Sequence, residues 1–177
     1  MHLLRQLKAM EGPLRPLARE DMPQLVAWDN DPEIVALAGK KFHAGQAEAV
    51  RWWEQARRDR HLAAFAIADE AGRLLGDIML KHISWRRREA ELQVTIGDRS
   101  RWGQGYGTAA IRELLGLAFG PLSLRRVYLR VHASNQRALA VYARLGFRPV
   151  GRLLPGQRLP GPPLILMELR REAFRAG

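Results

Sequence analysis

The chain contains no cysteine among its 177 residues, which excludes disulfide scaffolds, thiolate zinc sites and cysteine nucleophiles. Its apolar runs end well before the roughly 18 residues that a membrane span needs. The leucine-rich start is broken by Arg5 and Lys8, which is unlike a secretory signal. We therefore expect a cytoplasmic protein that does not enter a membrane.

Lysine is scarce as well, because only four of the 29 basic residues are lysine and 25 are arginine. With 18 acidic residues, the formal net charge is +11. Such an excess favours a polyanionic partner: nucleic acid, an acidic protein or a phosphate-bearing cofactor. An arginine-rich genome composition would explain the charge equally well. A ribosome or an acidic protein therefore remains one alternative among the partners.

Short segments of alternating apolar residues and longer segments of helical spacing share the chain. In the segment 89–97, Ala90, Leu92 and Val94 alternate with polar residues at the two-residue period of a strand. The same patterns predict strands over 14–17, 62–68, 74–83, 89–97, 124–132, 147–153 and 164–169, and helices over 20–29, 46–58, 105–119 and 135–145. The tripeptide Asn30-Asp31-Pro32 is expected to stop the first helix.

The fold class predicted by this order is α/β: one domain with a mixed, mostly antiparallel sheet of about seven strands, flanked by about four helices. The domain would cover residues 13–172. An N-terminal extension over 1–12 would precede it, and a C-terminal tail over 173–177 would follow.

One loop carries the clearest chemical signal. Gly103, Gly105 and Gly107 lie between a predicted strand and the strongest predicted helix. Glycine permits positive φ and the close approach of a ligand, while the start of a helix presents unpaired N–H groups and the positive end of its dipole. This pattern predicts an anion site, most naturally for phosphate. A tight turn with glycines chosen only for geometry is the alternative.

Other chemistries lack their motifs. No Gly-Lys-Ser/Thr follows the loop, so it is not a Walker P-loop, and the glycines are one residue short of a dinucleotide-binding fingerprint. The histidines have no metal-ligand spacing, and no serine lies in a Gly-x-Ser-x-Gly setting. We therefore expect no metal and no hydrolase triad.

The loop sequence Trp102-Gly103-Gln104-Gly105-Tyr106-Gly107 resembles the acetyl-CoA signature of the GNAT family of N-acetyltransferases. Trp102 stands where that signature usually has Gln or Arg. This departure resembles the branch related to ribosomal-protein N-terminal acetyltransferases. A second stretch, from Asn135 to Phe147, is similar to the later helix and strand of the family.

The resemblance implies that acetyl-CoA is the co-substrate. Main-chain N–H groups of residues 103–108 would hold its pyrophosphate, and the pantetheine arm would lie along a strand that splays from its neighbour. Asn135 would lie near the arm, although it also suits a helix cap. The implied cofactor-binding residues are Val94, Thr95, Ile96, Trp102, Gly103, Gln104, Gly105, Tyr106, Gly107, Thr108 and Asn135.

Acetyl transfer requires an acid for the leaving thiolate and a base for the attacking amine. Tyr142 suits the acid, as the resemblance also implies; packing beside Leu145 and Phe147 is its alternative role. Glu91 is the candidate base, with Glu89 in reserve. A water chain could replace either carboxylate, and pairing with the arginines of 86–88 would be a purely structural role.

The function predicted from these features is acetyl-CoA-dependent N-acetylation of a primary amine by direct attack, without an acetyl-enzyme. The acceptor could be a protein N-terminus, as the resemblance to the ribosomal branch implies. It could instead be a small amine such as an amino sugar or a polyamine. A non-catalytic acyl-CoA sensor is the alternative from another class. The protein is expected to be a monomer or a homodimer.

Overall fold

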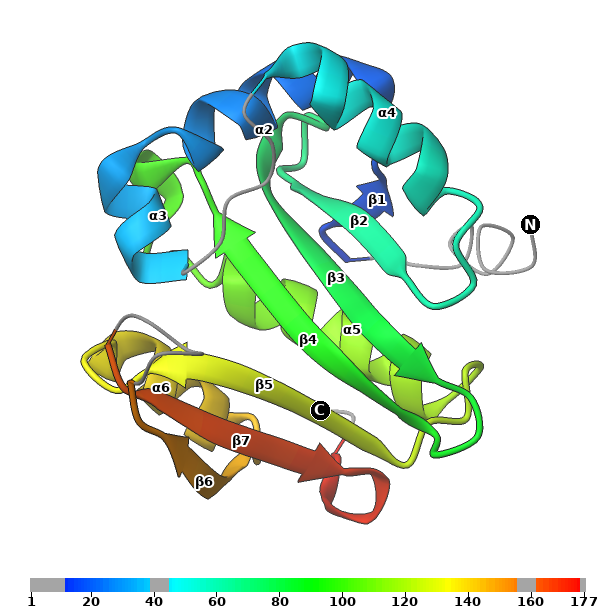
Figure 1. Cartoon of the computed structure of the whole chain (residues 1–177), viewed down its shortest axis with the longest axis vertical. Coiled ribbons are helices and arrows are strands. Elements are labelled where there is room, and N and C mark those ends of the chain that lie inside the picture. The colour runs from blue at the N-terminus through cyan, green and yellow to red at the C-terminus, as the bar shows by residue number, and fades with distance from the viewer. Residues whose placement is uncertain (1–11, 39–44, 156–161, 176–177) are drawn as a thin grey trace.

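Seven strands form a single sheet in the order β1-β2-β3-β4-β5-β7-β6 (Figure 1). The structure is a computed structural model that describes residues 12–38, 45–155 and 162–175. The strands are β1 (Leu14–Pro16), β2 (Ala63–Ala68), β3 (Leu74–Ser84), β4 (Glu89–Ile96), β5 (Arg126–His132), β6 (Arg148–Leu153) and β7 (Leu164–Arg170). All neighbours pair antiparallel except β4 and β5, so the predicted mixed, mostly antiparallel sheet is confirmed.

Within the described ranges there are five α-helices, one more than predicted. They are α2 (Met22–Asp29), α3 (Pro32–Ala38), α4 (Gln46–Ala56), α5 (Tyr106–Phe119) and α6 (Gln136–Arg144), with 3-10 turns at η2 (Arg19–Asp21), η3 (Arg99–Arg101) and η4 (Arg171–Ala173). None of these helices is long and apolar enough to cross a membrane.

The additional helix is α3. The tripeptide 30–32 does end α2, but Pro32 also begins a new helix. Proline is favoured in the first turn because its missing N–H needs no partner there. Asp31 caps that turn, since its Oδ1 accepts hydrogen bonds from the N–H groups of Glu33 at 3.0 Å and Ile34 at 3.4 Å.

Apolar residues on alternate strand positions place the main core on one face of the sheet. Ile78 and Leu80 of β3 are fully buried there, together with Ile111, Leu114 and Leu115 of α5. Helices α5 and α6 cover this face, behind the sheet in Figure 1. The opposite face carries a smaller core beneath α2 and α4, and the remainder of that face over β3, β4 and β5 is polar apart from the buried Met79.

Strands β4 and β5 separate along their length. Their parallel pairing is confined to residues 89–91 of β4 and 126–128 of β5. From Leu92 onward β4 pairs only with β3, and the two ribbons diverge toward the glycine loop (Figure 1). The splayed strand implied by the resemblance is therefore present.

Strand β7 lies between β5 and β6, an order that the sequence had not predicted. The predicted N-terminal extension over 1–12 lies almost entirely outside the described residues. The C-terminal tail is described only as far as Arg175.

Candidate active site

The glycine loop follows the open end of β4. Gly103 and Gly105 have φ of 78° and 91°, backbone conformations that residues other than glycine rarely adopt. A Cβ placed on Gly105 would meet no atom within 4 Å, so the main chain is accessible there. The loop therefore exposes bare backbone at the open end of β4.

Helix α5 begins at this loop without a side-chain cap. Gly105 is the N-cap residue, and the first helical hydrogen bond runs from the N–H of Ala109 to the carbonyl of Gly105 at 2.9 Å. The N–H groups of residues 106–108 precede that bond and have no partner within the helix. With the helix dipole behind them, these donors fit an anionic diphosphate.

Trp102 fixes the loop to the strand. Its indole Nε1 donates a hydrogen bond of 2.8 Å to the carbonyl of Ile96 at the end of β4. Its ring also meets Arg137 of α6, whose guanidinium carbon lies 5.8 Å from the ring centroid. The predicted ligand contact at Trp102 is thus accompanied by a clear structural role.

Arg137 is a residue that the sequence reasoning did not single out. Its Nη2 lies 3.5 Å from the position that a Cβ on Gly103 would take. A guanidinium beside bare main-chain donors adds the positive charge that a phosphate prefers. The sequence feature that could have identified Arg137 is its position two residues after Asn135, within the second motif.

The side chains of Gln104 and Tyr106 turn away from the open backbone. The Nε2 of Gln104 donates to the carbonyl of Ser100 at 2.7 Å. The hydroxyl of Tyr106 donates to Glu70 in the turn between β2 and β3 at 2.9 Å, and this bond raises the pKa of Tyr106. The side chains of both residues are therefore bonded elsewhere. Their main-chain groups, like those of Thr108, can still bind a ligand.

The last part of β4 borders the gap left by β5. Alternate residues direct their N–H and C=O groups to that side, because antiparallel pairing with β3 uses only every second position. Val94 and Ile96 pack against the main core. Thr95 faces the other way, and its buried Oγ1 has no hydrogen-bond partner among the described residues. This edge can accept an extended chain such as pantetheine.

Tyr142 lies on α6, on the same side of the sheet as α5. Its ring packs edge-on against Phe147, with the centroids 5.8 Å apart. Burial raises the pKa of Tyr142 to about 12. Among the described residues nothing forms a hydrogen bond with its hydroxyl. The ring is therefore packed against Phe147, as the purely structural role requires. The hydroxyl nevertheless keeps its proton and can still donate a hydrogen bond.

Glu91 faces the opposite side of the sheet from Tyr142 and is only 4 % exposed. Its Oε1 and Oε2 accept hydrogen bonds from Nε and Nη2 of Arg130 at 2.8 and 3.0 Å. Lys81 Nζ lies 3.7 Å from Oε1, and His82 Nδ1 lies 3.1 Å from Oε2. The carboxylate is thus held by groups from β3 and β5, which sequence spacing alone does not bring together.

Glu89, the reserve base, lies at the other end of the paired segment. Its Oε2 accepts a hydrogen bond of 3.1 Å from Arg126, and Arg87 lies 3.7 Å from Oε1. Arg87 is one of the three arginines of 86–88 that the sequence suggested as structural partners of this carboxylate. The geometry therefore favours Glu91 over Glu89 as a group near the gap.

Asn135 caps α6, since its Oδ1 accepts a hydrogen bond of 3.1 Å from the N–H of Ala138. The capping role weighed from the sequence is therefore present, and the side-chain amide nitrogen remains available. Among the described residues, no cluster of three or more histidine, aspartate or glutamate side chains could hold a metal ion.

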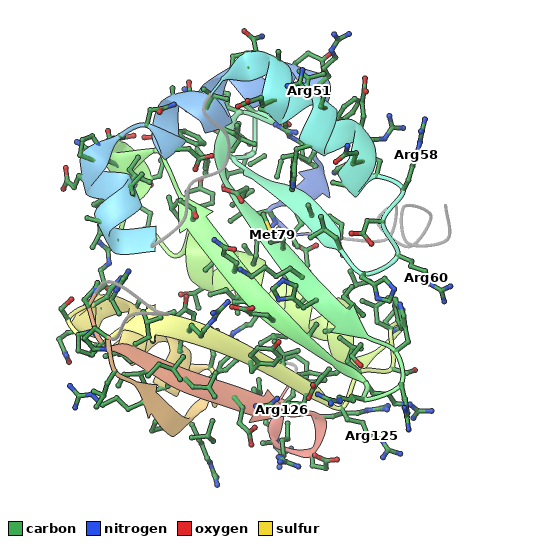
Figure 2. All side chains as sticks on the ribbon, in the orientation of Figure 1. Arg51, Arg58, Arg60, Met79, Arg125 and Arg126 are labelled. Atoms are coloured by element: carbon green, nitrogen blue, oxygen red, sulfur yellow. The ribbon has the colours of Figure 1, made fainter. Side chains whose placement is uncertain are left out.

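An open depression of about 510 Å³ lies away from this site, along α4. Its lining includes Arg51 and Arg58, which point outward from the helix layer in Figure 2. The glycine loop and the gap between β4 and β5 are not part of it.

Known proteins share this sequence pattern and architecture. The family described as acetyltransferase (GNAT) domain matches residues 13–148. The spermidine N(1)-acetyltransferase of Escherichia coli K12 is 28% identical over 141 residues, which cover 80% of this chain and 75% of that protein. The N-alpha-acetyltransferase RimI of Mycobacterium tuberculosis is 36% identical over 105 residues, 56% of this chain and 63% of that protein.

Solved structures agree on the fold. The crystal structure of spermidine N-acetyltransferase from Vibrio cholerae in complex with CoA and spermine has a TM-score of 0.82 at 24% identity, covering 90% of this chain and 95% of that one. A structure described as dodecameric, of the same Vibrio enzyme, has a TM-score of 0.77.

The family match spans most of the chain and includes both the glycine loop and the whole of the second motif. The relatives that match over 80% of the chain are named spermidine acetyltransferases, so the narrower resemblance to the ribosomal-protein branch is not the main one. The chain belongs to the GNAT acetyltransferase family and is an N-acetyltransferase that uses acetyl-CoA as its co-substrate.

Proposed function

We propose that the protein transfers the acetyl group of acetyl-CoA to a primary amine of a polyamine such as spermidine, within a ternary complex. The observation that carries this proposal is the 28% identity with the Escherichia coli spermidine enzyme over 80% of the chain. The bare loop beside a splayed strand supports the same donor. Direct attack is the route because the chain has no cysteine to carry an acetyl group.

Two buried carboxylates support a cationic acceptor. Asp77 pairs in register with Ala66, which belongs to the core beneath α2. Asp29 lies on the inward face of α2 with Met22 and Leu25, and all three are buried. Both acidic side chains therefore lie in the layer between α2 and the sheet, on the same side as Glu91. Negative charge on this side complements a polyamine.

In this proposal the loop and strand hold the donor. Main-chain N–H groups of residues 103–108 and the guanidinium of Arg137 bind the diphosphate. The arm extends along Val94, Thr95 and Ile96, and Asn135 lies beside it. A main-chain N–H on the open edge of β4, at the end of the arm that lies toward Glu91, stabilises the oxyanion, which needs a donor fixed before the reaction.

Tyr142 and Glu91 supply the proton transfers. The hydroxyl of Tyr142 gives its proton to the departing sulfur from the side of α6. The proton of the attacking amine passes toward Glu91 on the other face, directly or through a relay. Because the two groups lie on opposite faces of the sheet, donor and acceptor can approach the gap from opposite sides.

A protein N-terminus is the second candidate acceptor. The 36% identity with RimI over 105 residues favours it, although this match covers only 56% of the chain. The net charge of +11 also suits an acidic protein or a ribosomal surface better than a polycation.

Thiol release from acetyl-CoA with a panel of amines tests both candidates. A thiol reagent detects only free CoA, because the protein itself has no cysteine. We expect release with spermidine and spermine, and none with peptides, whether their α-amine is free or blocked. Release with the free peptide alone would overturn the polyamine proposal in favour of the second candidate, and release with an aminoglycoside alone would point to an amino sugar.

The number of subunits in the assembled protein is a separate question from the acceptor. We expected a monomer or a homodimer, whereas the Vibrio cholerae relative includes a structure described as dodecameric. Sedimentation velocity at micromolar concentration distinguishes these states directly.

A further inference from the structure

Strand β3 is irregular next to Glu91. The pairing register with β4 shifts between Lys81 and Ser84, and within this bulge His82 has φ of 54°. Positive φ is uncommon for a residue with a side chain, and such strain persists only where the surroundings hold it. Ile83 provides that hold, because its N–H donates to the carbonyl of His61 at 3.0 Å. Bulges of this kind redirect a side chain beside a functional site.

The redirected side chain of His82 reaches the buried carboxylate. Its Nδ1 lies 3.1 Å from Oε2 of Glu91, while 66% of the side chain remains exposed. An ionised carboxylate can only accept hydrogen bonds, so Nδ1 carries the proton in the neutral ring. The lone pair is then on Nε2, for which the described residues offer no hydrogen-bond partner. His82 therefore presents a free basic nitrogen to solvent.

Glu91 is less suited to accept the proton itself. Arg130 uses both of its oxygens in a two-point ion pair, and Lys81 lies near one of them. Taking a proton would break at least one of these bonds to a cation in a buried site. A carboxylate held in this way can orient a neighbouring imidazole and stabilise its charged form.

The pair lies where the gap between β4 and β5 begins. Glu91 pairs with Tyr128 in the last rung of the parallel ladder. From Glu91 to Ile96 the strand rises about 17 Å at about 3.3 Å per residue. A donor whose diphosphate is bound at the loop 103–108 and whose arm follows this strand directs its reactive end toward Glu91.

We propose that His82 is the general base of the acetyl transfer and that Glu91 is a positioning residue that orients it. This inference rests on the proposed function and deepens it by naming His82, rather than Glu91, as the group that accepts the amine proton. The amine nitrogen forms a bond to the thioester carbonyl carbon, and Nε2 of His82 takes the amine proton. The carbon–sulfur bond breaks, and the sulfur takes the proton of Tyr142. Solvent then restores both side chains.

The variant His82→Asn tests this role. Asparagine tolerates positive φ and can still donate a hydrogen bond to Glu91, but it has no basic nitrogen. We expect kcat to fall about 100- to 10,000-fold, with the KM for acetyl-CoA unchanged. Adding Glu91→Gln to this variant should cost little more, because the two residues act as a unit.

The pH profile distinguishes a base from a structural residue. The ratio of wild-type to variant kcat is taken at each pH, so that titration of the acceptor amine cancels. We expect the ratio to fall toward low pH, because only a neutral imidazole can accept a proton. The charged and titratable groups around His82 are Lys81, Glu91, Tyr128, Arg130 and His61, and none of them is altered in His82→Asn. A ratio that stays near one at every pH would overturn the proposal.

A second readout does not depend on activity. Nitrogen NMR of the histidine rings in the free protein reports which nitrogen is protonated in the neutral form. We expect His82 to carry its proton on Nδ1, and to lose this preference in Glu91→Gln; a neutral ring protonated on Nε2 would contradict the proposal. Wild-type protein that releases no thiol with any amine would contradict the proposed function instead, whatever the NMR shows.

Discussion

Replacing Tyr142 with phenylalanine removes one hydroxyl and keeps the ring that packs on Phe147. The pKa of Tyr142, raised to about 12 by burial, keeps the phenol protonated throughout the working range of pH. A thiol has a pKa near 8.5, so complete transfer of the proton to a free thiolate is uphill by about 3.5 units, or about 5 kcal/mol. Transfer must therefore accompany cleavage of the carbon–sulfur bond.

General-acid assistance of this kind contributes about 100- to 10,000-fold, so Tyr142→Phe should lower kcat by that factor. The loss should be the same at pH 7 and pH 9.5, because the phenol does not ionise between them. The free energy of unfolding, measured by urea titration, should change by less than about 1 kcal/mol, since the hydroxyl has no hydrogen-bond partner among the described residues. A variant that keeps wild-type kcat, or that loses CoA affinity and stability together, would refute the role as an acid.

Gly105→Ala should cost about 1–2 kcal/mol of stability because of its φ of 91°, and it should weaken CoA binding at least about tenfold. Gly72→Ala is the matched control, since Gly72 has φ of 80° and equally open space; equal loss of CoA affinity in both, measured by calorimetry, would argue against the diphosphate site. Gly116→Ala, at an exposed position in the last turn of α5 where the new Cβ would meet no atom of another element within 4 Å, should raise the unfolding free energy by about 0.5–1 kcal/mol without changing kcat. An unchanged or lower unfolding free energy would show that this helix position is constrained. The pKa of Tyr142 rises from 10.0 to about 12 on folding, so stability should hold below pH 10 and fall as the pH rises toward 12, by at most about 2.7 kcal/mol. Urea titrations of wild type and Tyr142→Phe in that range check this, and an equal fall in both would contradict it.

The parts of the fold that follow from local pattern were predictable from the sequence. The alternation around Leu92 and the helical spacing after Gly105 identify β4 and α5 because each element buries one apolar face. Helix α3 was missed because Pro32 was interpreted as a stop, although proline also starts helices after a capping aspartate.

Long-range geometry was not predictable in the same way. The ion pair between Glu91 and Arg130 joins residues 39 positions apart and depends on the register of the short parallel ladder. The contact with His82 depends on a bulge and a positive φ, for which neighbouring residues give no signal. Sequence motifs therefore pointed to the proposed donor loop, whereas the surroundings of the candidate base could be described only from the strand pairing.

A crystal structure of the protein with CoA tests the central claim most directly, because it shows where the diphosphate binds. We predict that its oxygens lie within about 3 Å of main-chain nitrogens of residues 103–108, at the start of α5 and beside Arg137. A diphosphate bound anywhere else on the molecule, such as among the arginines near the start of β5 (Figure 2), would contradict the account.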